Sequence, residues 1–190
     1  MNHHENVKII AFVGLAGSGK TAAVDYLTGK GYPKVYFGGI FYEAMQEAGL
    51  TPGDWEPENK FRKEIREREG KDFVVNRAVK QFRKLTEAGQ HRLIADGLYS
   101  WTEYKIMKHE FPGELTVVAV VAPKHLRKHR LVNRPERPVS PAEVDERDWR
   151  EIEDIEKGGP IAIADYYVMN DKDLDHLYTQ LEAILRQIDF

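Results

Sequence analysis

The stretch VKIIAFVGLAGSGKT, residues 7–21, decides the fold of this chain. Residues 7–13 form a short, apolar and largely β-branched run, which predicts a buried strand. Gly14–Thr21 follow the pattern G-x-x-x-x-G-K-[ST], a glycine-rich loop between a strand and a helix. A helix is predicted from Lys20 to Lys30, where glycines stop it. The stretch therefore predicts a strand–loop–helix unit that holds phosphate.

The residue types of this loop suit a nucleotide. Glycines let backbone N–H groups surround phosphate oxygens without Cβ clashes, and the helix N-terminus adds positive potential. Lys20 is expected to reach the β- and γ-phosphates, and the Thr21 hydroxyl to ligate Mg²⁺. A structural glycine-rich turn is the alternative, but the strand before the loop and the helix after it favour phosphate binding. The predicted site for ATP and Mg²⁺ comprises Gly14, Leu15, Ala16, Gly17, Ser18, Gly19, Lys20 and Thr21.

Apolar runs alternate with longer helical patterns along the rest of the chain. Further strands are predicted at 34–37, 91–95, 115–121 and 166–169. This alternation predicts an α/β fold with a parallel sheet and helices on both faces. A length of 190 residues suits one domain with a small mobile insert. Helices are predicted at 40–48, 58–69, 72–88, 100–110, 123–133, 140–158 and 171–188. Capping boxes are predicted at Ser100 with Glu103 and at Ser140 with Glu143, and Asp171 is predicted to cap the final helix.

Asp96 follows the third predicted strand and is followed by Gly97. Ligands of parallel sheets bind at the carboxyl ends of the strands, where this acid lies. In P-loop enzymes an acid at this position orients Mg²⁺ or its water, and the glycine lets the chain turn beside the nucleotide. A helix cap or a turn aspartate is the alternative. Together with the phosphate loop, Asp96 is predicted to serve the metal.

An arginine-rich segment follows the fourth predicted strand. The chain carries 28 basic and 31 acidic residues, a net charge of −3, yet residues 124–137 have six basic residues and one acid. Arginine matches phosphate oxygens through its planar fork. Two arginine-bearing helices are therefore predicted to close as a lid over a triphosphate, although a solvated, ion-paired face is the alternative. The arginines concerned are Arg127, Arg130, Arg134, Arg137, Arg147 and Arg150.

Two stretches between the second and third predicted strands are candidates for an acceptor site. Arg62 and Arg66 are four residues apart, so they share a helix face and are candidates for holding an anionic group. The alternative is a solvated helix with i,i+4 ion pairs. Gly38 and Gly39 are predicted to form a loop that a substrate approaches closely, and a simple turn is the alternative.

Composition excludes several classes of protein. The chain has no cysteine, which removes disulfides, thiolate metal sites and cysteine nucleophiles and fits a reducing cytosol. The near-neutral charge argues against nucleic acid as a partner. The start of the chain is polar, and the longest apolar stretch is far below the roughly 20 residues that span a bilayer. We therefore expect a cytoplasmic protein with no membrane contact, and composition leaves open whether it is a monomer or a homodimer.

With these motifs in order, the chain resembles the nucleoside-monophosphate-kinase-like branch of P-loop kinases, which includes adenylate kinases and dephospho-coenzyme A kinases. It is most similar to an archaeal-type family related to them. The resemblance covers nearly the whole chain. It rests on GLAGSGKT at 14–21, REREGKD at 66–72, IADG at 94–97, RLVNR at 130–134, ERDWREI at 146–152 and IADYYVMN at 163–170.

The resemblance implies a three-layer P-loop NTPase fold with a five-stranded parallel sheet in the order 2-3-1-4-5 and a helical lid. The core would comprise residues 7–37, 90–126 and 160–190, the acceptor-binding helical insert about 38–89 and the lid about 127–159. The implied activity is Mg²⁺-ATP-dependent phosphoryl transfer to a nucleoside monophosphate or a dephospho-coenzyme A-like molecule. A regulatory ATPase without a small-molecule acceptor, and a kinase of a non-nucleotide or of a nucleic-acid 5′-hydroxyl, are the alternatives.

The roles implied by the resemblance fall on matching residues. The catalytic set is Lys20, Asp96, Arg130, Arg134, Arg147 and Arg150, the metal ligands are Thr21 and Asp96, and the acceptor residues are Gly39, Arg62, Arg66 and Gly97. Two departures remove polar groups from the expected acceptor site. The residues after the second strand read GGIFY at 38–42, and Tyr99 replaces the usual basic residue after the Asp-Gly pair.

Overall fold

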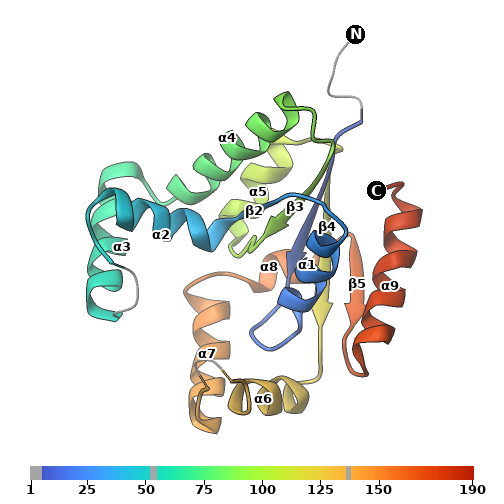
Figure 1. Cartoon of the computed structure of the whole chain (residues 1–190). Coiled ribbons are helices and arrows are strands. Elements are labelled where there is room, and N and C mark those ends of the chain that lie inside the picture. The colour runs from blue at the N-terminus through green and yellow to red at the C-terminus, as the bar shows by residue number, and fades with distance from the viewer. Residues whose placement is uncertain (1–5, 52–54, 136–137) are drawn as a thin grey trace.

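A computed structural model describes residues 6–51, 55–135 and 138–190 (Figure 1). At its centre is a parallel sheet of five strands in the order β2-β3-β1-β4-β5. This confirms the predicted fold class and the predicted strand order. The strands are β1 (Lys8–Val13), β2 (Lys34–Tyr36), β3 (Arg92–Asp96), β4 (Leu115–Val121) and β5 (Tyr166–Met169).

The register of the sheet brings the strand ends to one edge. Phe12 of β1 pairs with Asp96 of β3, and Asp96 also pairs with Tyr36 of β2. On the other side of β1, Val13 pairs with Ala119 of β4. The loop that follows β1 therefore begins beside Asp96, as ligand sites at the carboxyl ends of parallel strands require.

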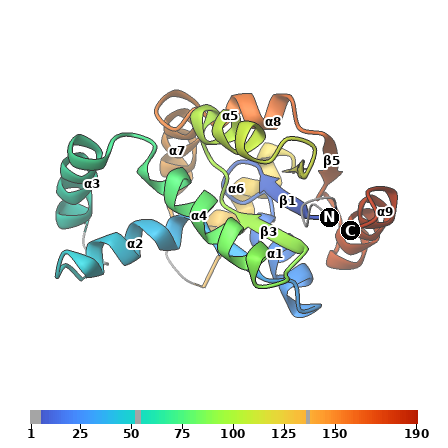
Figure 2. The ribbon, with the colours of Figure 1, turned by 90° about the horizontal axis from the view of Figure 1, so that it is seen from above.

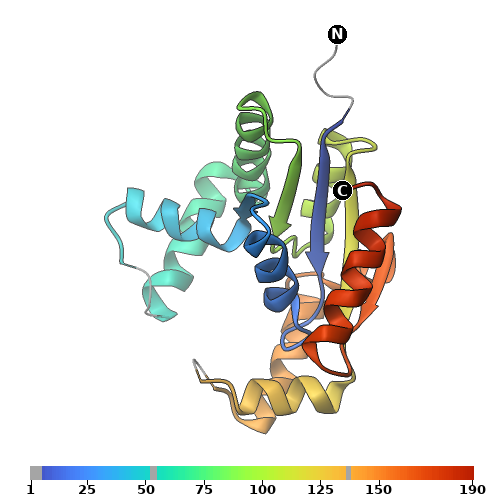
Figure 3. The same cartoon turned by 45° about the vertical axis from the view of Figure 1, so that its right-hand side comes forward.

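Helices cover both faces of the sheet, and alternate residues of β1 point to the two faces. Ile9 and Ala11 pack with α4 (Phe73–Glu87) and α5 (Trp101–Glu110), whereas Ile10 and Phe12 pack with α1 (Lys20–Gly29) and α9 (Leu174–Gln187). The apolar pattern of β1 thus reflects burial on both sides. Figure 3 shows α1 and α9 in front of the sheet and α4 behind it.

Two helices project away from this three-layer core. They are α2 (Phe37–Glu47) and α3 (Trp55–Glu69), which lie between β2 and β3 in the sequence. Their projection is clear from above (Figure 2). A separate apolar cluster joins them to the start of α4 through Phe41, Ala44, Met45, Phe61, Ile65 and Phe73.

The carboxyl edge of the sheet is covered by α6 (Lys124–Val132) and α7 (Pro141–Glu153), followed by the short α8 (Gly158–Ala162). Figure 1 shows α6 and α7 below the strand ends. A capping box of Ser140 and Glu143 starts α7, and one of Ser100 and Glu103 starts α5. Both boxes confirm predictions made from the sequence.

Two local predictions are wrong. Gly38 and Gly39 form the first turn of α2 instead of a loop, because the ring of Tyr36 folds against them and a Cβ at either glycine would lie 2.7–2.8 Å from that ring. The final helix is capped by Asp173, whose side chain accepts from the backbone N–H of His176 at 2.9 Å, and not by Asp171.

Among the described residues, no helix is long and apolar enough to cross a membrane.

Candidate active site

The phosphate loop is shaped by positions that admit only glycine. Gly14 has φ +147°, and a Cβ there would lie 2.3 Å from the backbone oxygen of Val120. Gly19 has φ +105°, and a Cβ there would lie 2.0 Å from Nδ2 of Asn170. The hydroxyl of Ser18 is buried in the loop without a hydrogen-bond partner in the structure. Tight backbone packing and an unsatisfied hydroxyl are what a loop that accepts phosphate oxygens offers.

This geometry predicts the effect of Gly14→Ala on stability. Alanine at a positive φ costs about 1–2 kcal/mol. The contact with the Val120 backbone oxygen adds an overpacking cost of about 1–3 kcal/mol, because a backbone atom cannot move aside cheaply. Gly31→Ala is the matched control, since Gly31 has φ +93° and a Cβ there would meet nothing within 4 Å. Chemical denaturation of the two variants measures the difference, and equal losses would contradict the close approach.

Asn170 anchors the loop from the end of β5. Its Nδ2 donates to the backbone oxygen of Ser18 at 2.8 Å, and its own backbone N–H donates to Val121 at 2.8 Å. Arg130 of α6 donates to the backbone oxygens of Asn170 at 2.9 Å and of Gly17 at 3.4 Å. Asn170 is buried, so these bonds replace its water contacts. This role was not predicted from the sequence, where the only signal was a polar residue directly after the fifth strand.

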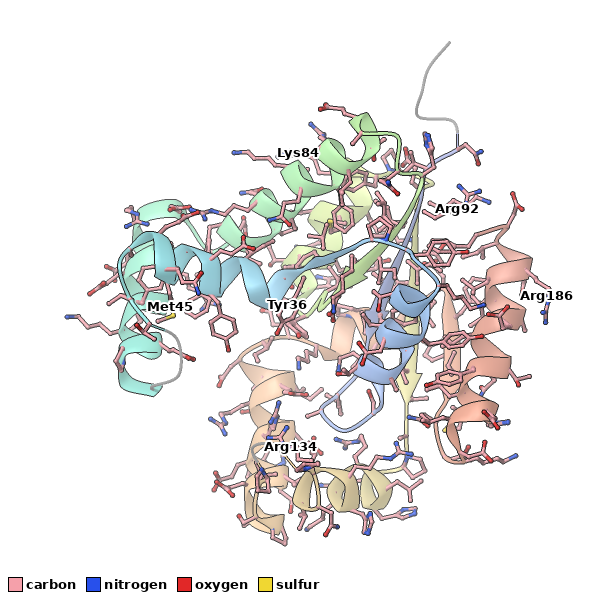
Figure 4. All side chains as sticks on the ribbon, in the orientation of Figure 1. Tyr36, Met45, Lys84, Arg92, Arg134 and Arg186 are labelled. Carbon is pink, nitrogen blue, oxygen red and sulfur yellow. The ribbon has the colours of Figure 1, made fainter. Side chains whose placement is uncertain are left out.

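A pocket of about 280 Å³ opens between the phosphate loop and α6. Figure 4 shows Arg134 at the end of α6, below the loop and near α7. The structure therefore brings two of the predicted lid arginines to the predicted nucleotide site. The pocket is lined by Gly17, Gly19, Lys20, Thr21, Arg130, Leu131 and Arg134.

Lys20 is held inside the loop. Its Nζ donates to the backbone oxygen of Gly14 at 2.7 Å and approaches that of Leu15 at 3.4 Å. Burial lowers the pKa of Lys20 to about 8, and the positive charges of Lys157 and Arg147 act in the same direction. A phosphate beside Lys20 would oppose both effects, since a nearby negative charge favours the protonated amine.

Asp96 and Thr21 can supply oxygen ligands for Mg²⁺. Asp96 ends β3 and forms an ion pair with Lys34 of β2, at 3.2 Å between Nζ and Oδ2. Thr21 is exposed and lines the pocket. The described part of the chain contains no group of three or more His, Asp or Glu that would hold a metal by itself. Mg²⁺ keeps several waters and binds through one or two protein oxygens plus substrate phosphates.

Arg127, which the sequence grouped with the lid arginines, has a structural role. Its guanidinium binds both carboxylate oxygens of Asp148 on α7, at 2.7 and 2.8 Å, and Nη1 also donates to the backbone oxygen of Ala16 at 3.1 Å. Both side chains are buried. This pair locks α6, α7 and the phosphate loop together. Arg137, from the same group, lies outside the described residues.

A second charged group lies between α7 and the phosphate loop. Glu151 accepts from the backbone N–H of Ala16 at 2.9 Å, and its other carboxylate oxygen contacts Arg147 at 3.3 Å and Lys157 at 2.9 Å. Arg147 was predicted from the sequence, whereas Glu151 and Lys157 were not. Arg150 is exposed on α7 and interacts electrostatically with Glu143, so its predicted catalytic role stays a prediction.

The predicted acceptor residues are not gathered as expected. Gly39 is covered by Tyr36 within α2, which corrects the predicted substrate loop. Gly97 has φ +95° and packs against the ring of Tyr99, as a turn beside the site requires. Arg66 is exposed on α3 and its charge acts on Glu103 of α5. The side chain of Arg62 lies outside the described residues.

Comparison with known sequences places the chain in a family. Residues 10–156 match the family described as an AAA domain. A UPF0200 protein of Thermococcus onnurineus is 32% identical over 185 residues, covering 95% of this chain and 97% of the relative. A UPF0200 protein of Sulfurisphaera tokodaii is 30% identical over 185 residues, covering 96% and 98%. The fold and phosphate loop thus define a P-loop protein with an AAA domain. Within that class, the chain belongs to the UPF0200 family.

Solved structures share this fold. A gluconokinase from Sinorhizobium meliloti has a TM-score of 0.61 at 13% identity, covering 96% of this chain and 93% of the other. A shikimate kinase from Bacteroides thetaiotaomicron has a TM-score of 0.58 at 13% identity, covering 96% and 99%. At this identity the likeness extends to the fold alone. It is the P-loop kinase fold, whereas the resemblance to adenylate and dephospho-coenzyme A kinases stays a prediction.

Proposed function

We propose that the protein is a kinase that transfers a phosphoryl group from Mg²⁺-bound ATP to a nucleotide or nucleotide-like small molecule. One observation carries the proposal. The phosphate loop with Lys20 lines a single pocket together with Arg130 of α6 and Arg134, which follows the end of that helix. Phosphoryl transfer requires mainly positioning and positive charge around the transferred group, and this pocket supplies both.

Each group of residues in the pocket is proposed to have its own role in phosphoryl transfer. Backbone N–H groups of the loop hold the phosphates, and the amine of Lys20 neutralises negative charge of the β- and γ-phosphates. Arg130 and Arg134 stabilise the charge that spreads over the transferred group. Mg²⁺, held by Thr21 and Asp96 with water, would neutralise phosphate oxygens. The acceptor oxygen bonds to the γ-phosphorus as the bond from that phosphorus to the β,γ-bridging oxygen breaks, ADP leaves, and a hydroxyl acceptor releases its proton to solvent.

The acceptor is proposed to carry an aromatic base. Tyr36 lies at the junction of the core and α2, is 43% exposed, and presents a ring there (Figure 4). It pairs in the sheet with Asp96, so an acceptor stacked on it would reach the predicted metal site. Arg66 on α3 is available for an anionic group of the same molecule. Aromatic stacking and a cation together suit a nucleotide.

A coupled assay that detects ADP tests this proposal. We expect Mg²⁺-ATP turnover to rise at least tenfold with one member of a panel of nucleoside monophosphates, deoxynucleotides and dephospho-coenzyme A. Shikimate and gluconate are included as acceptors without a base, because they distinguish the nucleotide class from the non-nucleotide alternative. Stimulation only by these acids would overturn the nucleotide acceptor. Slow hydrolysis unaffected by every acceptor would instead support a regulatory ATPase.

A further inference from the structure

The buried carboxylate of Glu151 is surrounded by N–H donors. It accepts from a backbone N–H of the phosphate loop, that of Ala16, at 2.9 Å. Its second oxygen lies 2.9 Å from Nζ of Lys157 and 3.3 Å from Nε of Arg147. Glu151 and Lys157 are 4% and 7% exposed. Three N–H donors, from the phosphate loop, from α7 and from the residue before α8, therefore converge on one buried carboxylate.

The same donors suit a phosphoryl group. Arginine, lysine and a loop N–H are the partners that bind phosphate oxygens in proteins, and a carboxylate is the side chain that most resembles such an anion. Burial raises the pKa of Glu151, but Lys157, the Ala16 N–H and Arg147 lower it more, so the carboxylate stays charged. The carboxylate of Glu151 thus occupies donors that would also suit an external oxyanion.

We propose that the Ala16 N–H, Arg147 and Lys157 form a subsite for the terminal phosphoryl group of the nucleotide, and that Glu151 occupies this subsite until the nucleotide displaces it. The inference rests on the proposed function, since it assigns further residues to the same reaction. In loops of this sequence the backbone N–H groups cradle the α- and β-phosphates, whereas the lysine reaches the β- and γ-phosphates. The charges of Lys157, Glu151 and Arg147 all act on Lys20, so the proposed subsite lies beside the amine that the γ-phosphate would contact.

The proposed exchange involves the side chain of Glu151 and no movement of α7. The buried pair of Arg127 and Asp148 fixes α7 to α6 and to the loop, so only the side chain of Glu151 has to turn away. Lys157 has a second support, because its Nζ lies 4.7 Å from the centre of the Tyr99 ring. This cation–π contact keeps Lys157 in the site after Glu151 leaves. If Glu151 instead stays in place and orients Lys157 and Arg147, its removal would weaken the binding of the nucleotide.

Equilibrium binding tests the subsite without requiring turnover. The β,γ-imido analogue of ATP and ADP, each with Mg²⁺, are titrated calorimetrically into wild-type protein, Glu151→Gln and Glu153→Gln. Glu153 is exposed on the same helix, so its variant matches the change in net charge. We expect Glu151→Gln to bind the analogue about tenfold more tightly than Glu153→Gln, which corresponds to about 1.4 kcal/mol, with ADP affinity within about twofold.

Lys157→Gln provides a second, independent variant. It should bind the analogue about tenfold more weakly than wild type, while ADP affinity changes by less than about twofold. The subsite is overturned if Glu151→Gln binds the analogue no more tightly than Glu153→Gln does. It is also overturned if Lys157→Gln binds the analogue as tightly as wild type. Wild-type protein that binds neither nucleotide overturns the proposed function instead, so the two failures are distinguishable.

Discussion

Replacing Lys20 with alanine should reduce phosphoryl transfer about a thousandfold while leaving the fold intact. Removing one preorganised group that stabilises transition-state charge typically costs a factor of about 10²–10³. Lys20 is the amine held inside the loop, at 2.7 Å from the Gly14 backbone oxygen, and no other described lysine lines the pocket. The measurement is kcat/KM for the acceptor identified in the panel, at saturating Mg²⁺.

The structure also predicts that this substitution is tolerated. Burial disfavours the charged form of Lys20, so its removal relieves a desolvation cost and thermal stability should not fall. Lys80→Ala is the matched control, because Lys80 is exposed on α4, away from the carboxyl edge of the sheet, and loses the same charge. Full turnover by Lys20→Ala would exclude the proposed mechanism. A cooperative unfolding transition near that of wild type separates loss of chemistry from loss of structure.

The features predicted correctly from the sequence depend on residues close together in the chain. Gly14–Thr21 form one continuous segment, and Ser140 and Glu143 are three residues apart, so each pattern specifies its own local geometry. The strand order was instead implied by the family resemblance and is confirmed by the pairing in the sheet. Local patterns therefore predicted the loop and the helix cap, and family likeness supplied the topology around them.

The site residues that were not predicted act across long separations in the chain. Asn170 bonds to a residue 152 positions earlier, and Glu151 to one 135 positions earlier. Nothing near either residue in the sequence distinguishes it from a turn asparagine or a solvated glutamate. The error at Gly39 has a different cause, since the ring of Tyr36 fills the space that a loop would leave open. Tertiary packing therefore decided what local composition left ambiguous.

The basic residues that follow β4, within 124–137, have two different roles. Lys124 and Lys128 pair with Asp145 of α7, and Arg127 pairs with Asp148 of the same helix. These contacts neutralise part of the local positive charge by joining α6 to α7. Arg130 and Arg134 line the pocket instead. The excess of charge seen in the sequence thus serves both to hold the two helices together and to line the proposed nucleotide site.

A second large effect, on the free energy of unfolding, is expected at the buried ion pair of Arg127 and Asp148. Arg127→Ala should lower the free energy of unfolding by about 3–5 kcal/mol, because it leaves Asp148 charged and buried without its partner. The loss also removes the bond to the Ala16 backbone oxygen, so the phosphate loop should lose protection from hydrogen exchange together with α7. Chemical denaturation gives the free energy, and hydrogen exchange locates the change.

Two further variants separate the buried charge from the helix contact. Arg127→Met combined with Asp148→Leu removes both charges and fills the space with apolar side chains, which should recover most of the stability, since such replacements are often neutral. Lys128→Ala removes a neighbouring cation whose contact with Asp145 is exposed and 3.8 Å long. That substitution should cost less than about 1 kcal/mol. If Arg127→Ala cost no more than Lys128→Ala, the pair would not be what fixes α7 against the phosphate loop, and the displacement of Glu151 would have to involve the whole helix.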